Sequence, residues 1–337
     1  MEVFETGKLS SHYLAKLLGR IEINDERVVV GPGIGEDAAV VDMGNRYLIV
    51  KSDPITFVAE RIGWYVVHIN ANDIAAMGGV PRWFLVTMLL PEGKTNRKLI
   101  EGIMDDLNES CKELGITLVG GHTEITPGLR NPILAGTMLG ETTRDRLIRN
   151  GSIAEGDFLY IVKGIAIEAT SVIARDRRED VIRRFGEQFY KRCVNFIVDP
   201  GISVVEDAVK VHEYLKVSGM HDPTEGGVLN GGYEMAVGSG VGLELYLDEI
   251  PVYPETKALC DFFKISPYSS LASGALLVAV NPSDAERLES LFSKDGEFGV
   301  KRIGRFLKKG ERMYVVQNGV RTPVEPSGKD EVTKIIK

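Results

Sequence analysis

The sequence is poor in cysteine, in basic clusters and in long apolar runs, and each scarcity excludes a class of protein. Its 337 residues include three cysteines, Cys111, Cys193 and Cys260, which are widely separated and form no CxxC pair. This pattern argues against a disulfide framework or a zinc site and fits a reducing compartment. No apolar run is long enough to cross a bilayer, and residues 1–20 hold no signal-peptide core. We therefore expect a cytoplasmic protein with no membrane partner.

The charge balance is acidic and lacks any basic block. There are 48 acidic against 40 basic residues, and the net charge is −8. The densest basic run, residues 175–184, is interleaved with Asp and Glu. Nucleic-acid binding requires clustered cations that neutralise phosphates, so we expect no nucleic-acid partner. A surplus of carboxylates suits a protein that holds divalent cations, although many proteins without metal ions are equally acidic.

The chain length favours two domains, because single hydrophobic cores rarely grow beyond about 300 residues. The hydrophobic pattern of the first half predicts strands first and then strands that alternate with helices. The predicted strands are 28–30, 38–42, 47–51, 83–90, 116–119 and 132–140, and the predicted helices are 61–77 and 96–114. The second half predicts strands at 158–163, 242–246, 274–280 and 313–317, with helices in 165–190, at 203–214 and after 227, and an irregular stretch at 320–328. The fold class is therefore α/β (α+β), with predicted domains 1–145 and 146–337.

A glycine-rich loop, Gly31-Pro32-Gly33-Ile34-Gly35, lies directly before Glu36 and Asp37. Backbone N–H groups of such a loop can approach an anion closely, and the Asp37 carboxylate can reach a metal ion. The GxGxG spacing differs from the dinucleotide-binding fingerprint, and no helix obviously follows it. A phosphate-binding loop and an ordinary hairpin loop are both consistent with this segment.

Two segments place polar side chains on apolar elements. Asp53 ends an apolar strand, where it either binds a cation or caps its own turn. Asn72 and Asp73 lie in a predicted helix otherwise built from small and apolar residues. Buried polar groups cost free energy unless they have partners. The pair therefore indicates either a metal site or a local hydrogen-bonded brace within the helix.

Two later loops also carry side chains that can bind ligands. Gly120-Gly121 precedes His122 and Glu124, and Glu124 is a candidate ligand for a hard cation. His122 either binds phosphate or orients substrate, or it is a structural histidine. In the segment 221–227, Asp222 lies just before a predicted helix whose first N–H groups point outward. Thr224 is alternatively the N-cap of that helix.

Two familiar catalytic motifs are absent. Residues 91–95, PEGKT, end like a P-loop, but Met88 occupies the position that requires glycine. The sequence also contains no G-x-S-x-G elbow, so a serine hydrolase has no support.

The order of the motifs is more specific than any one of them. GEDAAVV (35–41), SDPIT (52–56), NDIAAMGGVP (72–81), GGHTEITPG (120–128), HDPTEGG (221–227) and SGALL (273–277) follow one another along the chain. This series resembles the aminoimidazole ribonucleotide synthetase (PurM)-like superfamily. That group includes HypE, thiamine-monophosphate kinase, selenophosphate synthetase and formylglycinamidine ribonucleotide synthetase. The resemblance extends from about Gly31 to Leu277.

The resemblance implies a two-domain fold in which the N-terminal sheets of a homodimer pair into a barrel, followed by a C-terminal α/β sandwich. It implies ATP and Mg²⁺ as cofactors and transfer of the γ-phosphate to an oxygen of a small-molecule substrate. Magnesium held by carboxylates neutralises the phosphoryl oxygens in such reactions. The implied metal ligands are Asp37, Asp53 and Asp73. The implied cofactor-binding residues are Gly31, Gly33, Gly35, Asn72 and Asp222, and the implied catalytic residues are Asp73, Glu124 and His122.

Assignment to one member rests on two differences. HDPTEGG looks most like HypE, but HypE ends in a cysteine and residues 331–337 hold none. The segment 120–124 is closer to the ribonucleotide synthetase and to selenophosphate synthetase, whose usual N-terminal reactive cysteine has no counterpart before Cys111. We expect a HypE-like paralogue that acts on a separate small molecule. The alternatives are a maturation factor that acts on a carbamoyl or thiocarboxamide group with a partner protein, and a nucleotide-sensing dimer without turnover.

Overall fold

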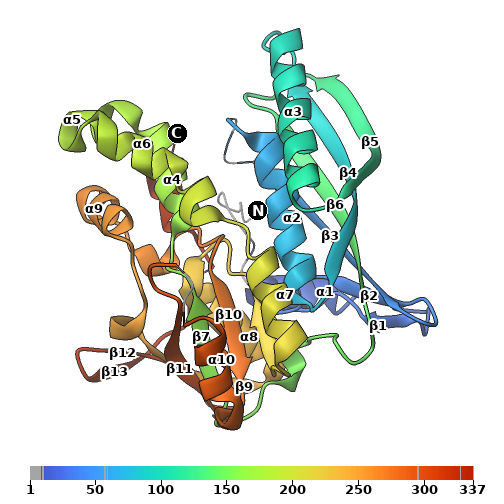
Figure 1. Ribbon diagram of the computed structural model, residues 1–337, viewed down its shortest axis with the longest axis vertical. Helices are drawn as coiled ribbons and strands as arrows, with labels where there is room; N and C mark the ends of the chain where they lie inside the picture. Colours follow the sequence, from blue (N-terminus) through green and yellow to red (C-terminus); the bar gives the residue numbers. More distant parts are fainter. Residues whose placement is uncertain are drawn as a thin grey trace. The chain divides into compact units, whose positions relative to one another are not determined.

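The computed structural model describes residue 9 and residues 11–56, 58, 60–293, 296–326 and 328–336 (Figure 1). The chain forms two compact units. The N-terminal unit comprises residues 23–31 and 37–147, and the C-terminal unit comprises residues 1–22, 32–36 and 148–337. Each unit contains its own sheet, as the predicted mixed α/β class requires.

The N-terminal unit is a six-stranded sheet in the order β1-β2-β3-β6-β4-β5. All neighbouring strands are antiparallel except β4 and β5, which are parallel. Its strands are β1 (Val28–Val30), β2 (Ala39–Asp42), β3 (Tyr47–Ile55), β4 (Val80–Pro91), β5 (Thr117–Thr126) and β6 (Ile133–Thr142).

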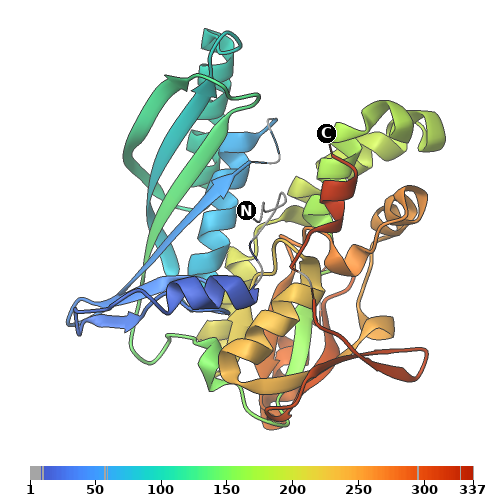
Figure 2. The same ribbon diagram turned by 180° about the vertical axis from the view of Figure 1, so that it is seen from behind.

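Two helices cover one face of this sheet, which we call the inner face. Helix α2 (Ile62–Ala76) packs against β3, β4 and β6, and all fifteen of its residues are buried. Helix α3 (Arg97–Glu113) packs on α2 through a stripe that includes Ile103 and Leu107, and it stands in front of the strands in Figure 1 and behind them in Figure 2. Both helices agree with the predicted ranges, because a capping asparagine and paired glycines define their ends.

Strand β5 corrects one prediction. The sequence pattern predicts a strand that ends at residue 119, followed by a loop at Gly120-Gly121, but the strand continues through both glycines to Thr126. A Cβ atom on Gly121 would lie 1.9 Å from the carbonyl oxygen of Val86 on β4. The glycine therefore permits close pairing of two strands.

The C-terminal unit is a seven-stranded sheet in the order β13-β12-β9-β11-β7-β10-β8. Its strands are β7 (Phe158–Val162), β8 (Gly219–His221), β9 (Val241–Tyr246), β10 (Leu276–Val280), β11 (Val300–Lys309), β12 (Met313–Gln317) and β13 (Val320–Pro323). Its helices are α1 (Ser11–Leu18), α4 (Ile167–Asp176), α5 (Arg178–Phe185), α6 (Glu187–Asn195), α7 (Val205–Tyr214), α8 (Gly227–Ser239), α9 (Pro254–Phe263) and α10 (Ala285–Leu291). The core lies between the sheet and α8, where Met235 packs with Leu159 and Leu243.

Three strands of this sheet differ from the sequence-based prediction. Strands β8 and β11 were not predicted, and β13 occupies part of the stretch predicted to be irregular. β11 pairs with both β7 and β9, and β13 is an exposed edge strand on β12. In both strands, charged residues interrupt the apolar pattern, so backbone pairing sets the conformation more than side-chain burial does. Among the described helices, none combines the length and apolarity needed to cross a membrane.

Candidate functional site

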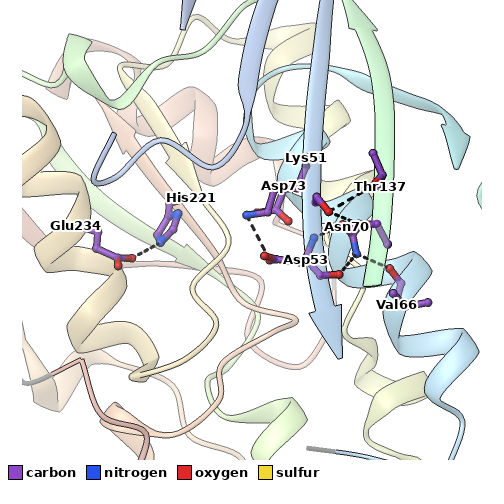
Figure 3. Close-up of polar contacts among 10 residues, drawn as sticks. Lys51, Asp53, Val66, Asn70, Asp73, Thr137, His221 and Glu234 are labelled. Atoms are coloured by element: carbon purple, nitrogen blue, oxygen red, sulfur yellow. Dashed lines mark hydrogen bonds and ion pairs between the residues drawn. The ribbon is translucent and has the colours of Figure 1, made fainter. Parts of the chain in front are cut away.

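Strand β3 and helix α2 bring three charged side chains together on the inner face of the N-terminal unit. Lys51 and Asp53 are two residues apart on β3, so their side chains point to the same side of the sheet. The Lys51 Nζ atom lies 2.9 Å from Asp73 Oδ1 and 3.3 Å from Asp53 Oδ2 (Figure 3). The predicted convergence of Asp53 and Asp73 is therefore present, with a lysine ammonium between them.

Asn70 fixes the strand to the helix at this point. Its Oδ1 atom accepts a hydrogen bond of 2.9 Å from the backbone N–H of Asp53. Its Nδ2 atom donates to the carbonyl oxygens of Asp53 at 3.2 Å and of Val66 at 2.8 Å (Figure 3). Gly136 on β6 makes room for this side chain, because a Cβ atom there would lie 2.6 Å from Asn70 Nδ2. Asn70 and Asp73 are three residues apart on α2 and so face the same strand.

The charges in this cluster act strongly on one another because the cluster is largely buried. Asp73 is 4% exposed and Asp37 is 7% exposed. Burial raises the pKa of Asp73, and the charges of Asp53 and Asp37 raise it further, while Lys51 opposes the shift. Burial alone would lower the pKa of Lys51, but the attraction of Asp73, Asp53 and Asp37 outweighs it and raises that pKa above its ordinary value. Asp37 thus belongs electrostatically to the same cluster.

The carboxylates fit a divalent cation. Asp73 Oδ2 is buried and has no hydrogen-bond partner within the described part of the chain. The side chain of Asp53 is 36% exposed, so the cluster is accessible from one side. Hard cations such as Mg²⁺ prefer carboxylate oxygens as ligands. The chemistry of these carboxylates therefore suits a hard cation, and the metal-binding role of Asp37, Asp53 and Asp73 stays a prediction.

His122 and Glu124 lie on the opposite face of the same sheet, which we call the outer face. The register aligns Asp53, Gly136, Val86 and Gly121 in one row across the strands. His122 lies in the next row, opposite Thr87, and so points the other way. Its Nε2 atom lies 3.4 Å from Glu124 Oε2, and the two side chains are 65% and 49% exposed. The structure does not bring this pair to Asp73, and its catalytic role stays a prediction.

The other predicted residues divide between the two units. Asn72 is fully buried within α2. Gly31 belongs to the N-terminal unit, whereas Gly33 and Gly35 belong to the C-terminal unit. The carbonyl oxygen of Gly35 accepts a hydrogen bond of 2.7 Å from Asn150 Nδ2, so this end of the glycine-rich loop is anchored. The predicted phosphate-binding role of the three glycines stays a prediction.

The HDPTEGG segment forms a polar site within the C-terminal unit. It joins the end of β8 to α8. His221 Nε2 lies 3.3 Å from Glu234 Oε2 on α8 (Figure 3). Asn230 Nδ2 donates a hydrogen bond of 3.1 Å to Glu234 Oε1. Asp222 is 2% exposed. A buried acidic residue beside a histidine–glutamate pair suits phosphate or metal chemistry, and the cofactor-binding role of Asp222 stays a prediction.

Lys51 and Asn70 were not predicted from the sequence. The spacing of Lys51 and Asp53 already placed them on one face of β3, and this signal was available. Asn70 had no such signal, because every residue of α2 is buried and the helix has no polar side to indicate its orientation.

Comparison with known proteins identifies the family. The family model described as AIR synthase related protein, N-terminal domain, matches residues 35–142, and the corresponding C-terminal domain matches residues 154–316. The chain belongs to the AIR synthase related family. This family member is 28% identical over 273 residues to a putative hydrogenase expression/formation protein of Methanocaldococcus jannaschii, and the match covers 78% of each chain.

Solved structures show that this AIR synthase related protein has the predicted fold. A structure of hydrogenase maturation protein HypE in complex with ATP aligns with a TM-score of 0.70 at 20% identity and covers 96% of this chain and 97% of that one. HypE in a HypE–HypF complex aligns with a TM-score of 0.72 at 21% identity and covers 87% and 94%. The two-domain PurM-like fold and the resemblance to HypE are therefore confirmed.

Proposed function

We propose that the chain is a Mg²⁺-dependent ATP-binding enzyme that transfers the γ-phosphate to an oxygen of a small-molecule substrate. The observation that carries this proposal is the pairing of Asp53 and Asp73 across β3 and α2, with the buried oxygen Asp73 Oδ2 left without a hydrogen bond in the described residues. Membership of the family and the likeness to a HypE that binds ATP support the choice of nucleotide.

The residues of the cluster have distinct roles in this proposal. Asp53 and Asp73, with Asp37, would hold Mg²⁺, which neutralises phosphoryl oxygens when it is bound. Asn70 holds the backbone of Asp53, so the distance between the two carboxylates is set before any ligand binds. Burial strengthens every charge interaction in the cluster, because little water screens it.

The test is nucleotide binding followed by turnover. Calorimetric titration with ATP should show binding that requires Mg²⁺, and a panel of small molecules should then be screened for a compound that increases ADP formation. A compound that raises the melting temperature only when ATP is present identifies the acceptor. Failure to bind ATP at any Mg²⁺ concentration would refute the proposal. Tight binding without turnover for any acceptor would favour the nucleotide-sensing alternative.

A second candidate is a maturation factor that works with a partner protein. It is favoured by the relative named as a hydrogenase expression/formation protein and by the HypE–HypF complex among similar structures. In this case the activated group would be a carbamoyl or thiocarboxamide group carried by the partner. Affinity purification from the native cells, followed by turnover assays with the captured protein, distinguishes this case from a free small-molecule acceptor.

We further propose that the chain forms a homodimer through β4 and β5. Four large apolar side chains on these strands are exposed: Trp83 at 37%, Leu85 at 36%, Val119 at 52% and Ile125 at 51%. Strand β5 is at the edge of the sheet, and among the described residues β4 is the one strand that pairs with it. Exposed apolar side chains beside an unpaired strand edge are typical of association between sheets.

A further inference from the structure

Lys51 is a cation fixed inside the carboxylate cluster. Its side chain is 20% exposed, and its ammonium contacts two of the carboxylates proposed to hold metal. A lysine ammonium and a divalent cation compete for the same oxygens. The position of Lys51 therefore bears directly on how many cations the cluster can accept.

The formal charge of the cluster decides this number. The carboxylates whose charges act on Lys51 are Asp37, Asp53 and Asp73. When all three carboxylates are ionised, they and the ammonium carry a formal charge of −2, which one divalent cation neutralises. Without the ammonium, the three carboxylates would attract a cation more strongly and would leave room for another.

The two oxygens of Asp73 differ in a way that supports a single cation. Asp73 Oδ1 contacts Lys51 Nζ at 2.9 Å. Asp73 Oδ2 is buried and has no hydrogen-bond partner among the described residues. One oxygen of this carboxylate is thus engaged by the built-in cation, and the other remains for a metal ion.

We propose that Lys51 sets the metal stoichiometry of this cluster: its ammonium occupies the position of a second divalent cation, so that the nucleotide-free protein binds one. The proposal rests on the proposed function, because it assumes that the carboxylates hold metal. An ion pair that only stabilises the fold would have a different consequence. Its removal would lower stability without changing the number or affinity of bound cations.

The experiment measures Mn²⁺ binding to the nucleotide-free protein. Calorimetry gives the affinity and stoichiometry, and the electron paramagnetic resonance signal of free Mn²⁺ gives an independent count of bound ions. The wild-type protein should bind one Mn²⁺. Lys51→Met should bind a second Mn²⁺ or bind the first at least about tenfold more tightly, because one positive charge is lost. Lys51→Arg, which keeps the charge, should still bind one.

Two controls separate charge from general damage. Lys257→Met removes a lysine from an exposed pair with Asp261, 3.0 Å away, and should leave Mn²⁺ binding unchanged. The double variant Lys51→Met/Asp53→Asn restores the formal charge of −2 and should again bind one Mn²⁺. If Lys51→Met does not fold without metal, the rise in melting temperature with Mn²⁺ concentration can be measured instead. This rise should be larger for Lys51→Met than for the wild type, because the variant should bind metal more strongly.

The outcomes also separate this inference from the proposed function. A wild-type protein that binds neither Mn²⁺ nor ATP would overturn both. A wild-type protein that binds both, with a Lys51→Met variant of unchanged stoichiometry and affinity, would overturn only the role of Lys51.

Discussion

The two faces of the N-terminal sheet carry polar residues in opposite ways. On the inner face, Asn70 binds the backbone of Asp53, and the ammonium of Lys51 contacts the carboxylates of both Asp53 and Asp73. On the outer face, His122 and Glu124 are exposed beside apolar side chains of β4 and β5. Burial of a polar group without a hydrogen-bond or ionic partner costs free energy, so polar residues on the inner face require partners, either in the protein or in a ligand. Exposed polar residues carry no such requirement, and they are weaker indications of a site.

Loss of a carboxylate on the inner face should have the largest effect. Asp73→Asn should lower Mg²⁺-dependent ATP turnover roughly a hundredfold or more, because a metal ligand is lost. Asp261→Asn, at an exposed ion pair with Lys257, is the matched control and should keep full activity. Steady-state kinetics at varied Mg²⁺ measures both. Unchanged turnover in Asp73→Asn would remove this residue from the mechanism.

An aspartate on the outer face should disrupt association instead of chemistry. Leu85→Asp should raise the dimer dissociation constant roughly a hundredfold, because it places an unpaired charge in an apolar interface. Sedimentation equilibrium measures this constant. Val320→Asp, on the exposed edge strand β13 of the other unit, provides a control that should not alter it. A monomeric wild-type protein would refute the proposed interface.

The buried histidine of α2 should make the inner face sensitive to acid. Burial lowers the pKa of His68 from 6.5 to about 3, and the charge of Arg61 adds to the shift. Between pH 6.5 and pH 3, His68 is therefore protonated in the unfolded chain but not in the folded chain. The free energy of unfolding falls as the pH decreases through this range. His68→Phe should reduce this loss by about 3 kcal/mol at pH 4.5 relative to pH 7. Urea unfolding at the two pH values measures it, and equal pH dependence in both proteins would contradict the prediction.

Removal of the Asn70 side chain should weaken the attachment of β3 to α2. Asn70→Ala leaves the backbone N–H and carbonyl of Asp53 without their partner, which should lower the free energy of unfolding by about 2–3 kcal/mol. Asn281→Ala, which removes an exposed hydrogen bond to the Ser283 backbone, should cost about 1 kcal/mol or less. Urea denaturation of both variants tests the difference, and equal losses would show that Asn70 has no special role.

The smallest effect is expected from His122. Because it faces away from Asp73, His122→Ala should leave Mg²⁺-dependent ATP binding unchanged within about twofold. Calorimetry measures the affinity. A large loss of binding would show that the two faces act together, as the catalytic role predicted for His122 requires.

The sequence predicted the architecture better than the contacts. Motif order located Asp53 and Asp73, and periodicity located α2 and α3. The sequence pointed to Asn72 and gave no sign of Asn70, because a helix that is buried on all sides does not reveal which way its polar side chains point. The sequence also did not show that β5 continues through Gly121, because this continuation depends on the close approach of Val86 on β4, a strand distant in the sequence. Local patterns determine elements, whereas partners distant in the sequence determine which side chains meet.

The most direct test of the central claim is a crystal structure of the protein with Mn²⁺ and a non-hydrolysable ATP analogue. The account predicts an anomalous peak within metal–oxygen bonding distance, about 2.0–2.3 Å, of the carboxylates of Asp53 and Asp73, with the nucleotide phosphates beside it. A metal–nucleotide complex bound elsewhere, with the carboxylates of Asp53 and Asp73 still in contact with Lys51 and not with metal, would contradict it.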